Sequence, residues 1–417
     1  MVQLSRSLLH WRPLPYVLAL LTTTVILCIH MLPSVDSMLN ENNTKISHVF
    51  LRSQINYHKE IAPFARRPLT TLLIEGSQQL FGFKAGYAFI LVNFLLLGFS
   101  GVLIYWLSLL LKATKLQGII NMMVFFTSFS VLFAFFPPVF TYDEPLQYCS
   151  LLMAFIAFVR RKWFWYVILF SLAMVARETS VLLLPALILL LPGTQNHPRE
   201  KLGPNLKKNG IRILSPILVY GCYIVFFIYH QRLLHATHTE ITSRYSCFLE
   251  NIESTKNLVE SIVSIFITLG PFLYLTYFYL KQKENESWKT SFVYAFLLTA
   301  LLNTPLVFMT AFARESRLFA LPLLFLWPVF MQLFKSFLEP LSLKSTYQGL
   351  LGYPKIIVLF GCFVLASFLF CFIYYPSLGL GENTFFAGYI FSVCFVLSLH
   401  YCACKTLFNH QKYKPRT

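Results

Sequence analysis

Long apolar runs follow one another along almost the whole chain, and only short polar segments separate them. A helix needs about 20 apolar residues to cross the hydrocarbon core of a bilayer, and many of these runs approach or exceed that length. Only 12% of the 417 residues are charged, whereas soluble domains carry about 25%. Because an α-helix satisfies its own backbone hydrogen bonds in lipid, we predict an all-α, polytopic transmembrane helical bundle.

We predict about twelve spans, which together form a single integral membrane domain over residues 1–417. Apart from one ambiguous stretch, they cover residues 14–32, 85–111, 118–136, 146–159, 213–229, 258–280, 291–312, 318–333, 356–374 and 385–400. Residues 33–84 and 230–257 form the predicted outer loops, and residues 192–212 form a basic cytoplasmic loop. The apolar spacing in residues 68–81 predicts an interfacial helix within the first outer loop.

The ambiguous stretch, residues 163–191, fits two arrangements. One continuous helix of about 29 residues would be about 43 Å long, well over a hydrocarbon thickness of about 30 Å. Two helices that turn at Arg177-Glu178 would each be shorter than a usual span. Only this hairpin leaves the basic loop 192–212 on the side of the N-terminus, as the preference of Lys and Arg for cytoplasmic loops requires. We therefore predict the hairpin.

Basic residues gather in the loops on the side of both predicted termini, and most carboxylates lie on the opposite side. The membrane therefore explains the net charge of +17, and nothing supports nucleic-acid binding. We predict a multi-pass protein of a bacterial inner membrane, or of the endoplasmic reticulum in a eukaryote, with both termini in the cytoplasm. Because the carboxylates gather on the outer side, we expect the chemistry there.

One charged pattern occurs twice, in residues 176–185 and 313–322. In both copies an Ala-Arg-Glu triplet and a hydroxyl residue open an apolar segment, and a proline follows eight positions after the arginine. An ionisable side chain near the middle of a membrane costs about 2.5–3.5 kcal/mol or more, so it faces a cavity, a partner or the interface. These two copies are the strongest functional signal in the sequence.

Arg177, Arg314 and Arg317 in these copies are candidates for binding a phosphate or pyrophosphate, because a guanidinium matches two phosphate oxygens at once. Glu178 and Glu315 would hold the guanidinium groups in place. The structural alternative is that each Arg-Glu pair is a local ion pair that closes the end of a membrane helix.

Two acidic positions are candidates for a catalytic base. Asp36 lies a few residues beyond the first span, where a carboxylate can deprotonate an incoming acceptor hydroxyl or simply cap a turn. Asp143 and Glu144 stand directly before Pro145, beside Tyr142, at the predicted start of a helix. The helix dipole is expected to keep both acids ionised, which suits a base or a metal ligand.

Together these motifs resemble the polytopic GT-C-type glycosyltransferases, which use lipid-phosphate-linked sugars. The resemblance rests on Asp36 after the first span, on the acidic motif at 142–145, and on the charged motifs at 177–180 and 314–317. It implies that Asp36 activates the acceptor and that Arg177 and Arg314 contact the donor phosphate. The first loop has no Asp-x-Asp or Asp-Glu pair next to the first helix, which leaves Asp143 and Glu144 as alternative bases.

The resemblance implies a hexosyltransferase with a GT-C-like fold that acts at the non-cytoplasmic face. It would move a sugar from a polyprenyl-phosphate donor to a glycan, lipid or protein acceptor, with inversion in a single displacement. We predict no cofactor, since a divalent metal is chemically possible at the acids but no ligand pattern supports one. Two other classes fit the same features: a transporter or flippase for a lipid-linked or anionic substrate, and a non-catalytic membrane subunit.

Overall fold

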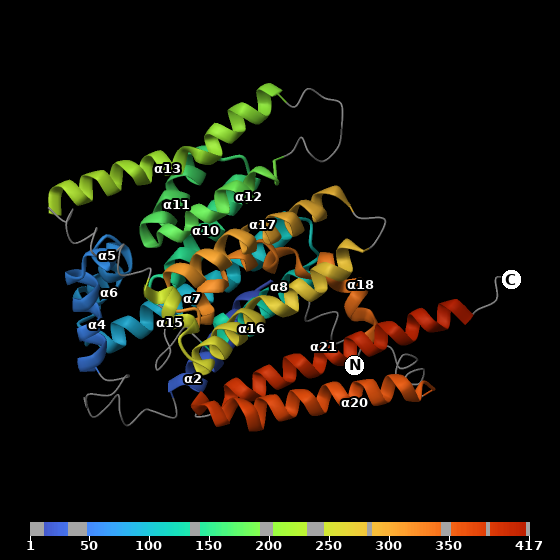
Figure 1. Cartoon of the computed structure of the whole chain (residues 1–417). Helices are drawn as coiled ribbons and strands as arrows, with labels where there is room; N and C mark the ends of the chain where they lie inside the picture. Colours follow the sequence, from blue (N-terminus) through green and yellow to red (C-terminus); the bar gives the residue numbers. More distant parts are fainter. Residues whose placement is uncertain are drawn as a thin grey trace. The chain divides into compact units, whose positions relative to one another are not determined.

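Helices make up the regular structure of the computed structural model, which describes residues 12–31, 48–133, 142–191, 203–231, 246–281, 286–342, 352–380 and 384–413. Within these ranges there are 17 α-helices with short 3₁₀ and π segments, and there is no strand (Figure 1). The predicted all-α architecture is therefore confirmed for the described part of the chain.

Seven of the described helices are long and apolar enough to cross a membrane. They are Ala85–Leu110, Asn209–His230, Thr255–Leu280, Ser287–Thr310, Leu321–Leu338, Pro354–Tyr374 and Phe386–Lys405. Four further apolar helices are shorter: Leu14–His30, Glu144–Val159, Trp163–Ala176 and Glu178–Ile188. These findings support a multi-pass membrane protein, while the number of twelve spans and the two sides of the membrane stay predictions.

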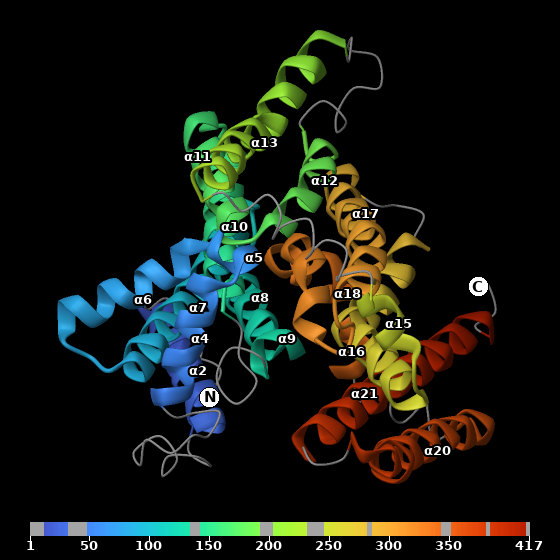
Figure 2. The ribbon, with the colours of Figure 1, turned by 60° about the vertical axis from the view of Figure 1, so that its left-hand side comes forward.

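The contacts divide the chain into two compact units. Unit 1 comprises residues 1–247, 286–311 and 317–332, and unit 2 comprises residues 248–285, 312–316 and 333–417. In unit 2, α20 (Pro354–Leu369) lies beside α21 (Thr384–Tyr413), as both views show (Figure 1, Figure 2). The imidazole of His400 on α21 bonds the carbonyl of Phe337 at 2.6 Å and the hydroxyl of Tyr274 on α16 (Thr255–Leu280) at 2.8 Å.

The centre of unit 1 is a row of neighbouring helices, each packed against the next. They are α2 (Leu14–Met31), α8 (Lys115–Thr127), α7 (Ala85–Leu110), α10 (Glu144–Val159), α11 (Trp163–Ala176) and α13 (Gly203–Gln231). The turns after α7 and α10 are tight, because Lys112 and Arg161 take left-handed φ angles of 66° and 56°. A capping box between Thr114 and Gln117 then starts α8.

The predicted span at 318–333 is a chain of short 3₁₀ helices, η3 (Ser316–Phe319), η4 (Leu321–Phe325) and η5 (Trp327–Val329), that leads into α18 (Phe330–Ser342). Pro322 and Pro328 stand at the starts of η4 and η5 and lack the N–H that a continuous α-helix needs. Trp327 is fully buried, and its indole donates to the hydroxyl of Ser128 at 2.9 Å. The irregular segment is thereby fixed against α8.

The described part of the predicted first outer loop contains three helices, of which the sequence analysis predicted one. They are α4 (His48–Glu60), α5 (Ala62–Ala65) and α6 (Pro68–Phe81), and α6 has the bounds of the predicted interfacial helix. Helix α4 buries His48, Leu51, Ile55 and His58, which recur at helical spacing and face α7. Polar residues separate these four positions in the sequence, so the buried side of α4 is not apparent from hydropathy.

Helix α4 lies close to α7 at one glycine. The backbone N–H of Gly86 donates to Nδ1 of His48 at 3.2 Å. A Cβ atom at position 86 would lie 2.5 Å from the same nitrogen. The approach of the two helices therefore depends on glycine at this position, and it holds α4 over the start of α7.

The stretch 163–191 is interrupted where the hairpin prediction put its turn. Helix α11 ends at Ala176, Arg177 is extended (φ −159°, ψ 119°), and a 3₁₀ helix η2 (Glu178–Leu183) leads into α12 (Leu184–Ile188). The hydroxyl of Ser180 donates to the carbonyl of Ala173, seven residues earlier, at 3.0 Å. A continuous helix would place these residues about 10 Å apart, so the single long helix is excluded.

Candidate functional site

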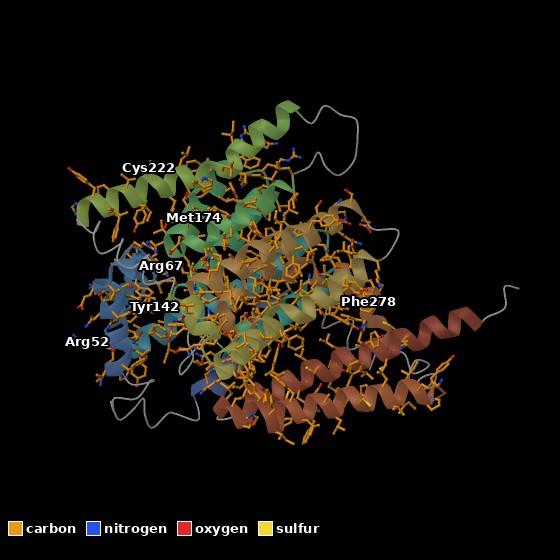
Figure 3. All side chains as sticks on the ribbon, in the orientation of Figure 1. Arg52, Arg67, Tyr142, Met174, Cys222 and Phe278 are labelled. Carbon is orange, nitrogen blue, oxygen red and sulfur yellow. The ribbon has the colours of Figure 1, made fainter. Side chains whose placement is uncertain are left out.

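Charged side chains from separate stretches of unit 1 meet beside the first turn of α10, in the region marked by Arg67 and Tyr142 in Figure 3. We call this set the charged cluster; its members are Arg66, Arg67, Asp143, Glu144, Arg177, Glu178 and Arg317. They come from the link between α5 and α6, the start of α10, the break after α11, and η3. Tertiary folding therefore assembles the cluster.

Glu178 binds the two arginines of the first loop. It accepts hydrogen bonds from Nε and Nη2 of Arg67, at 2.7 and 2.6 Å, and from Nη2 of Arg66 at 2.7 Å. Such two-pronged guanidinium–carboxylate pairs are among the strongest hydrogen bonds in proteins. The expectation that Glu178 holds its neighbour Arg177 is therefore wrong, because the contacts run to a segment more than 100 residues earlier.

Arg177 instead donates from Nη1 to Oε1 of Glu144. Nε of Arg317 lies 3.5 Å from the same carboxylate oxygen. Glu144 is buried, at 5% exposure, so this carboxylate is held between two guanidinium groups away from solvent. The pairing depends on the extended backbone at Arg177, which ends α11 beside the start of α10.

Asp143 occupies the other flank of the charged cluster. Its Oδ2 lies 3.7 Å from Nη1 of Arg67 and 4.0 Å from Nδ1 of His58, and the residue is 3% exposed. The His58 ring stacks on Tyr142 at a centroid distance of 3.6 Å. The Tyr142 hydroxyl in turn forms a 2.9 Å hydrogen bond with the hydroxyl of Thr71. A histidine, a tyrosine and an arginine thus fix the surroundings of this carboxylate.

Burial raises the pKa of Asp143 to about 6, although Arg67 and Arg177 pull it down. The side chain makes no capping hydrogen bond to α10, so desolvation outweighs the helix dipole on which the sequence argument relied. Burial also lowers the pKa of His58 to about 3, with help from Arg67 and Arg317. At neutral pH the imidazole is therefore uncharged, while Asp143 is largely ionised and close to its titration point.

The arginines keep their charges despite burial. Burial, together with the nearby Arg67 and Arg317, lowers the pKa of Arg177 to about 10. Burial acts in the same direction on Arg67, but Glu178 and Asp143 outweigh it and raise the pKa of Arg67. Four guanidinium groups thus face three carboxylates. The excess of positive charge favours an added anion.

A cavity of about 80 Å³ opens among Arg67, Glu144, Arg177, Glu178 and Arg317. Further polar lining comes from Gln147, Tyr148, Thr179 and Thr310. Sites for whole drug-sized ligands measure about 300–1,000 Å³. The cavity is therefore of a size for one small polar group of a ligand, and its guanidinium lining suits an anionic group such as phosphate.

The described residues of the chain contain no group of three or more His, Cys, Asp or Glu side chains that could hold a metal ion. The acids of the charged cluster are bound to arginines, which compete with a cation for the same oxygens. This donor set favours an anionic ligand.

The predicted candidates that meet in unit 1 are Tyr142, Asp143, Glu144, Arg177, Glu178 and Arg317. Arg314 and Glu315 belong to unit 2, where the carbonyl of Arg314 accepts a hydrogen bond from Ser264 and its guanidinium lies 4.8 Å from the centroid of the Phe312 ring. Asp36 lies outside the described residues. The roles assigned to all of these candidates stay predictions.

The sequence did not single out His58, and it indicated the pair Arg66-Arg67 only as a weaker candidate for a phosphate contact, with lipid headgroups as the alternative. In the structure this arginine pair binds Glu178. The sequence does contain a signal for this contact: Arg66 and Arg67 stand between two apolar segments, and two adjacent charges in such a place need a partner. His58 could be found from the buried stripe of α4, which it ends.

Comparison of the chain with protein-family models, with curated proteins and with solved structures finds no match.

Proposed function

We propose that this protein is a GT-C-like membrane glycosyltransferase of about twelve spans that transfers a sugar from a polyprenyl-phosphate donor to an acceptor at the non-cytoplasmic face. The observation that carries the proposal is the small cavity lined by Arg67, Arg177 and Arg317 beside the buried Asp143. It combines a place for a phosphate with a carboxylate that titrates near neutral pH.

The shape of a polyprenyl-phosphate sugar is compatible with this small cavity. A polyprenyl chain stays in the bilayer and only the phosphate and the sugar enter the protein. A cavity of about 80 Å³ suits the phosphate alone, so the sugar and the acceptor would lie outside the cavity. The guanidinium groups would neutralise the charge that develops on the leaving phosphate, which is a large term in such reactions.

In the proposed reaction, Asp143 removes the proton from the acceptor hydroxyl as its oxygen attacks the anomeric carbon of the sugar. A new carbon–oxygen bond forms to the acceptor, and the bond between the anomeric carbon and the phosphate oxygen breaks. The electron pair leaves with the polyprenyl phosphate, and the proton stays on Asp143. A single displacement of this kind inverts the anomeric centre.

Asp143 suits the role of base better than Glu144. Glu144 is bound by Arg177 and Arg317, so it is better placed to orient those two guanidinium groups. The pKa of Asp143, raised by burial to about 6, lies close to operating pH, where a general base is most effective. Asp36 remains the alternative base implied by the resemblance.

The proposal is tested with the purified chain and a labelled polyprenyl-phosphate hexose, by measuring release of lipid phosphate and labelling of an acceptor. We expect Asp143→Asn to lower turnover by about 10²–10⁴-fold, the usual contribution of a general base. Asp36→Asn is the parallel variant, and Glu286→Gln at an exposed position is the control. Unchanged turnover in both aspartate variants would exclude this mechanism.

The same protein in sealed vesicles tests transport. A flippase would move the lipid-linked sugar across the membrane with its bond to phosphate intact, and Asp143→Asn would then change movement without any transfer to an acceptor. We expect release of polyprenyl phosphate, so movement of unaltered substrate would replace the proposal with the transport function.

A further inference from the structure

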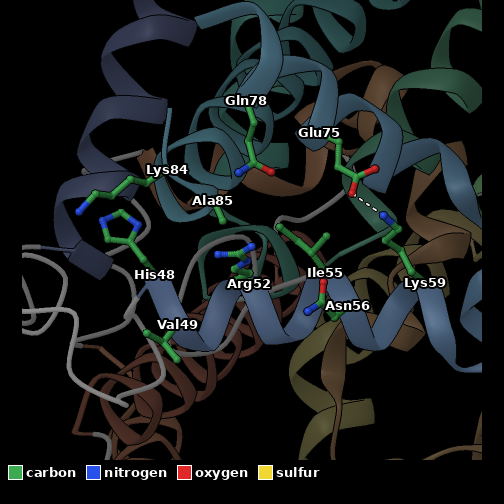
Figure 4. Close-up of a pocket in the computed structure, with 10 residues that line it drawn as sticks. All are labelled: His48, Val49, Arg52, Ile55, Asn56, Lys59, Glu75, Gln78, Lys84 and Ala85. Carbon is green, nitrogen blue, oxygen red and sulfur yellow. Dashed lines mark hydrogen bonds and ion pairs between the residues drawn. The ribbon is translucent and has the colours of Figure 1, made fainter. Parts of the chain in front are cut away.

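A second cavity of unit 1, about 590 Å³ in volume, lies between α4, α6 and the start of α7 (Figure 4). It is much larger than the cavity of the charged cluster, and the two share no lining residue. The side chains of Arg52 on α4 and Gln78 on α6 point toward each other across it (Figure 4). His48 and Lys84 lie at one end, and Lys59 lies at the other.

The charge of this lining is unbalanced. Arg52, Lys59 and Lys84 are basic, and Glu75 is the acid among the lining residues. Lys59 binds Glu75 at 2.7 Å, so the only acidic side chain of the lining is already paired with one of its three basic side chains. Arg52 has no hydrogen bond or ion pair within the part of the chain that the structure describes. A guanidinium with five free donors is well suited to a phosphate.

The exposed leucines of α6 suggest that this cavity lies next to the membrane interface. Glu75 and Gln78 of α6 line the cavity, whereas Leu72, Leu73 and Leu80 are exposed by 58%, 43% and 75%. By the rotation of about 100° per residue in an α-helix, Leu73 and Leu80 lie on the side opposite to Glu75 and Gln78, and Leu72 lies between the two sides. Such a helix rests in a membrane interface with its apolar side in the acyl region, at the depth of the lipid phosphates.

We infer that the cavity between α4, α6 and α7 binds the phosphate group of an anionic phospholipid, with Arg52 as its cationic ligand and Lys84 in the same lining. The volume fits a whole headgroup rather than a bare ion. The exposed leucines of α6 would face the acyl chains beside it. A soluble phosphate is the other source of the same chemistry, and the experiment separates the two.

The test is a binding titration of the purified full chain in detergent, read by native mass spectrometry. The probes are short-chain phosphatidylglycerol, phosphatidylcholine with the same chains, and inorganic pyrophosphate. We expect phosphatidylglycerol to bind more tightly than phosphatidylcholine. Arg52→Gln should weaken phosphatidylglycerol about tenfold or more, the effect of losing one charge-assisted hydrogen bond. Arg160→Gln, at an exposed arginine outside the cavity, should bind as the wild type does.

Arg52 is exposed and makes no hydrogen bond or ion pair among the described residues, so its substitution should leave the fold intact. Lys84→Gln provides a second variant. If pyrophosphate binds in an Arg52-dependent way and phosphatidylglycerol does not, the cavity binds a soluble phosphate and the phospholipid inference is wrong. If neither variant weakens phosphatidylglycerol or pyrophosphate, the inference is wrong. None of these readouts requires sugar transfer, so they are independent of the proposed enzymatic activity.

Discussion

The two copies of the Arg-Glu pattern have similar backbones but different surroundings. In both, 3₁₀ structure follows the charged pair, and the proline stands at the start of the next short helix, α12 or η4. Arg177 and Glu178 of the first copy enter the charged cluster through Glu144, Arg66 and Arg67. Arg314 of the second copy lies in unit 2 over the ring of Phe312 and interacts electrostatically with Glu260.

The difference shows what a short charged pattern determines. It determines the local backbone, because proline and the hydroxyl residue each act on the backbone within a few positions of themselves. It does not determine the partners, because these come from segments distant in the sequence. Of the second copy, Arg317 reaches Glu144, so the two copies make unequal contacts even though their sequences are alike.

The largest expected effect is on stability. Glu178→Gln should lower the free energy of unfolding by about 3 kcal/mol, because Arg67 is buried and would lose its carboxylate partner. Glu315 is only partly buried, so Glu315→Gln should cost about 1 kcal/mol or less. Both are measured by denaturant unfolding of the purified protein in detergent. Equal losses in the two variants would contradict the inequality of the copies.

The next effect is on turnover. Arg177→Lys keeps the charge but loses the planar fork of donors, and we expect about 10²–10³-fold slower sugar transfer. Arg314→Lys is the matched substitution in the second copy, and it should stay within about threefold of the wild type. The measurement is initial rate with the labelled donor at saturating concentration. A loss in Arg314→Lys as large as that in Arg177→Lys would assign the phosphate contact to both copies.

The pH dependence of transfer should report on Asp143. Its pKa is raised to about 6 by burial, so kcat/KM should fall about tenfold per pH unit below that value as the base becomes protonated. Arg67 pulls this pKa down, so Arg67→Gln should move the inflection to higher pH. Arg314→Gln in the second copy should leave it near 6. An inflection near pH 4 in the wild type would remove Asp143 as the base.

The smallest expected effect is a change in stability at Ser180, which occupies the position in the first copy that Arg317 occupies in the second. The Ser180 hydroxyl donates to backbone carbonyls of Ala173 and Arg177 and accepts from Gln147 at 2.9 Å. Ser180→Ala should therefore lower the free energy of unfolding by about 1–2 kcal/mol. Ser77→Ala, which removes an exposed hydroxyl bonded within its own helix, is the control and should have little effect.

Much of the helical layout is predictable from hydropathy. The bounds of α6 and the break at Arg177 agree with the expectations, since both follow from local patterns of apolar, charged and proline residues. The structure of 316–329 is not predictable in this way. It takes 3₁₀ form where Pro322 and Pro328 interrupt the ladder and Asn121 on α8 bonds the carbonyl of Pro328 at 2.7 Å, a contact between residues 207 positions apart.

The candidate site is predictable only in part for the same reason. Asp143, Glu144 and Arg177 stand out because charges are rare in an apolar chain. That Arg66 and Arg67 bind Glu178, or that His58 approaches Asp143, depends on the folding of α4 and α5 back onto the helices of unit 1. The pKa of Asp143 also depends on burial, which no local pattern shows.

The prolines that break the helix after residue 320 also lengthen the chain locally. Residues 321–329 are mostly 3₁₀, which rises about 2.0 Å per residue, whereas an α-helix rises about 1.5 Å. Nine residues would therefore extend about 18 Å instead of about 14 Å. A candidate span of only 18 residues, which as an ideal α-helix would be shorter than a hydrocarbon thickness of about 30 Å, gains length from its prolines.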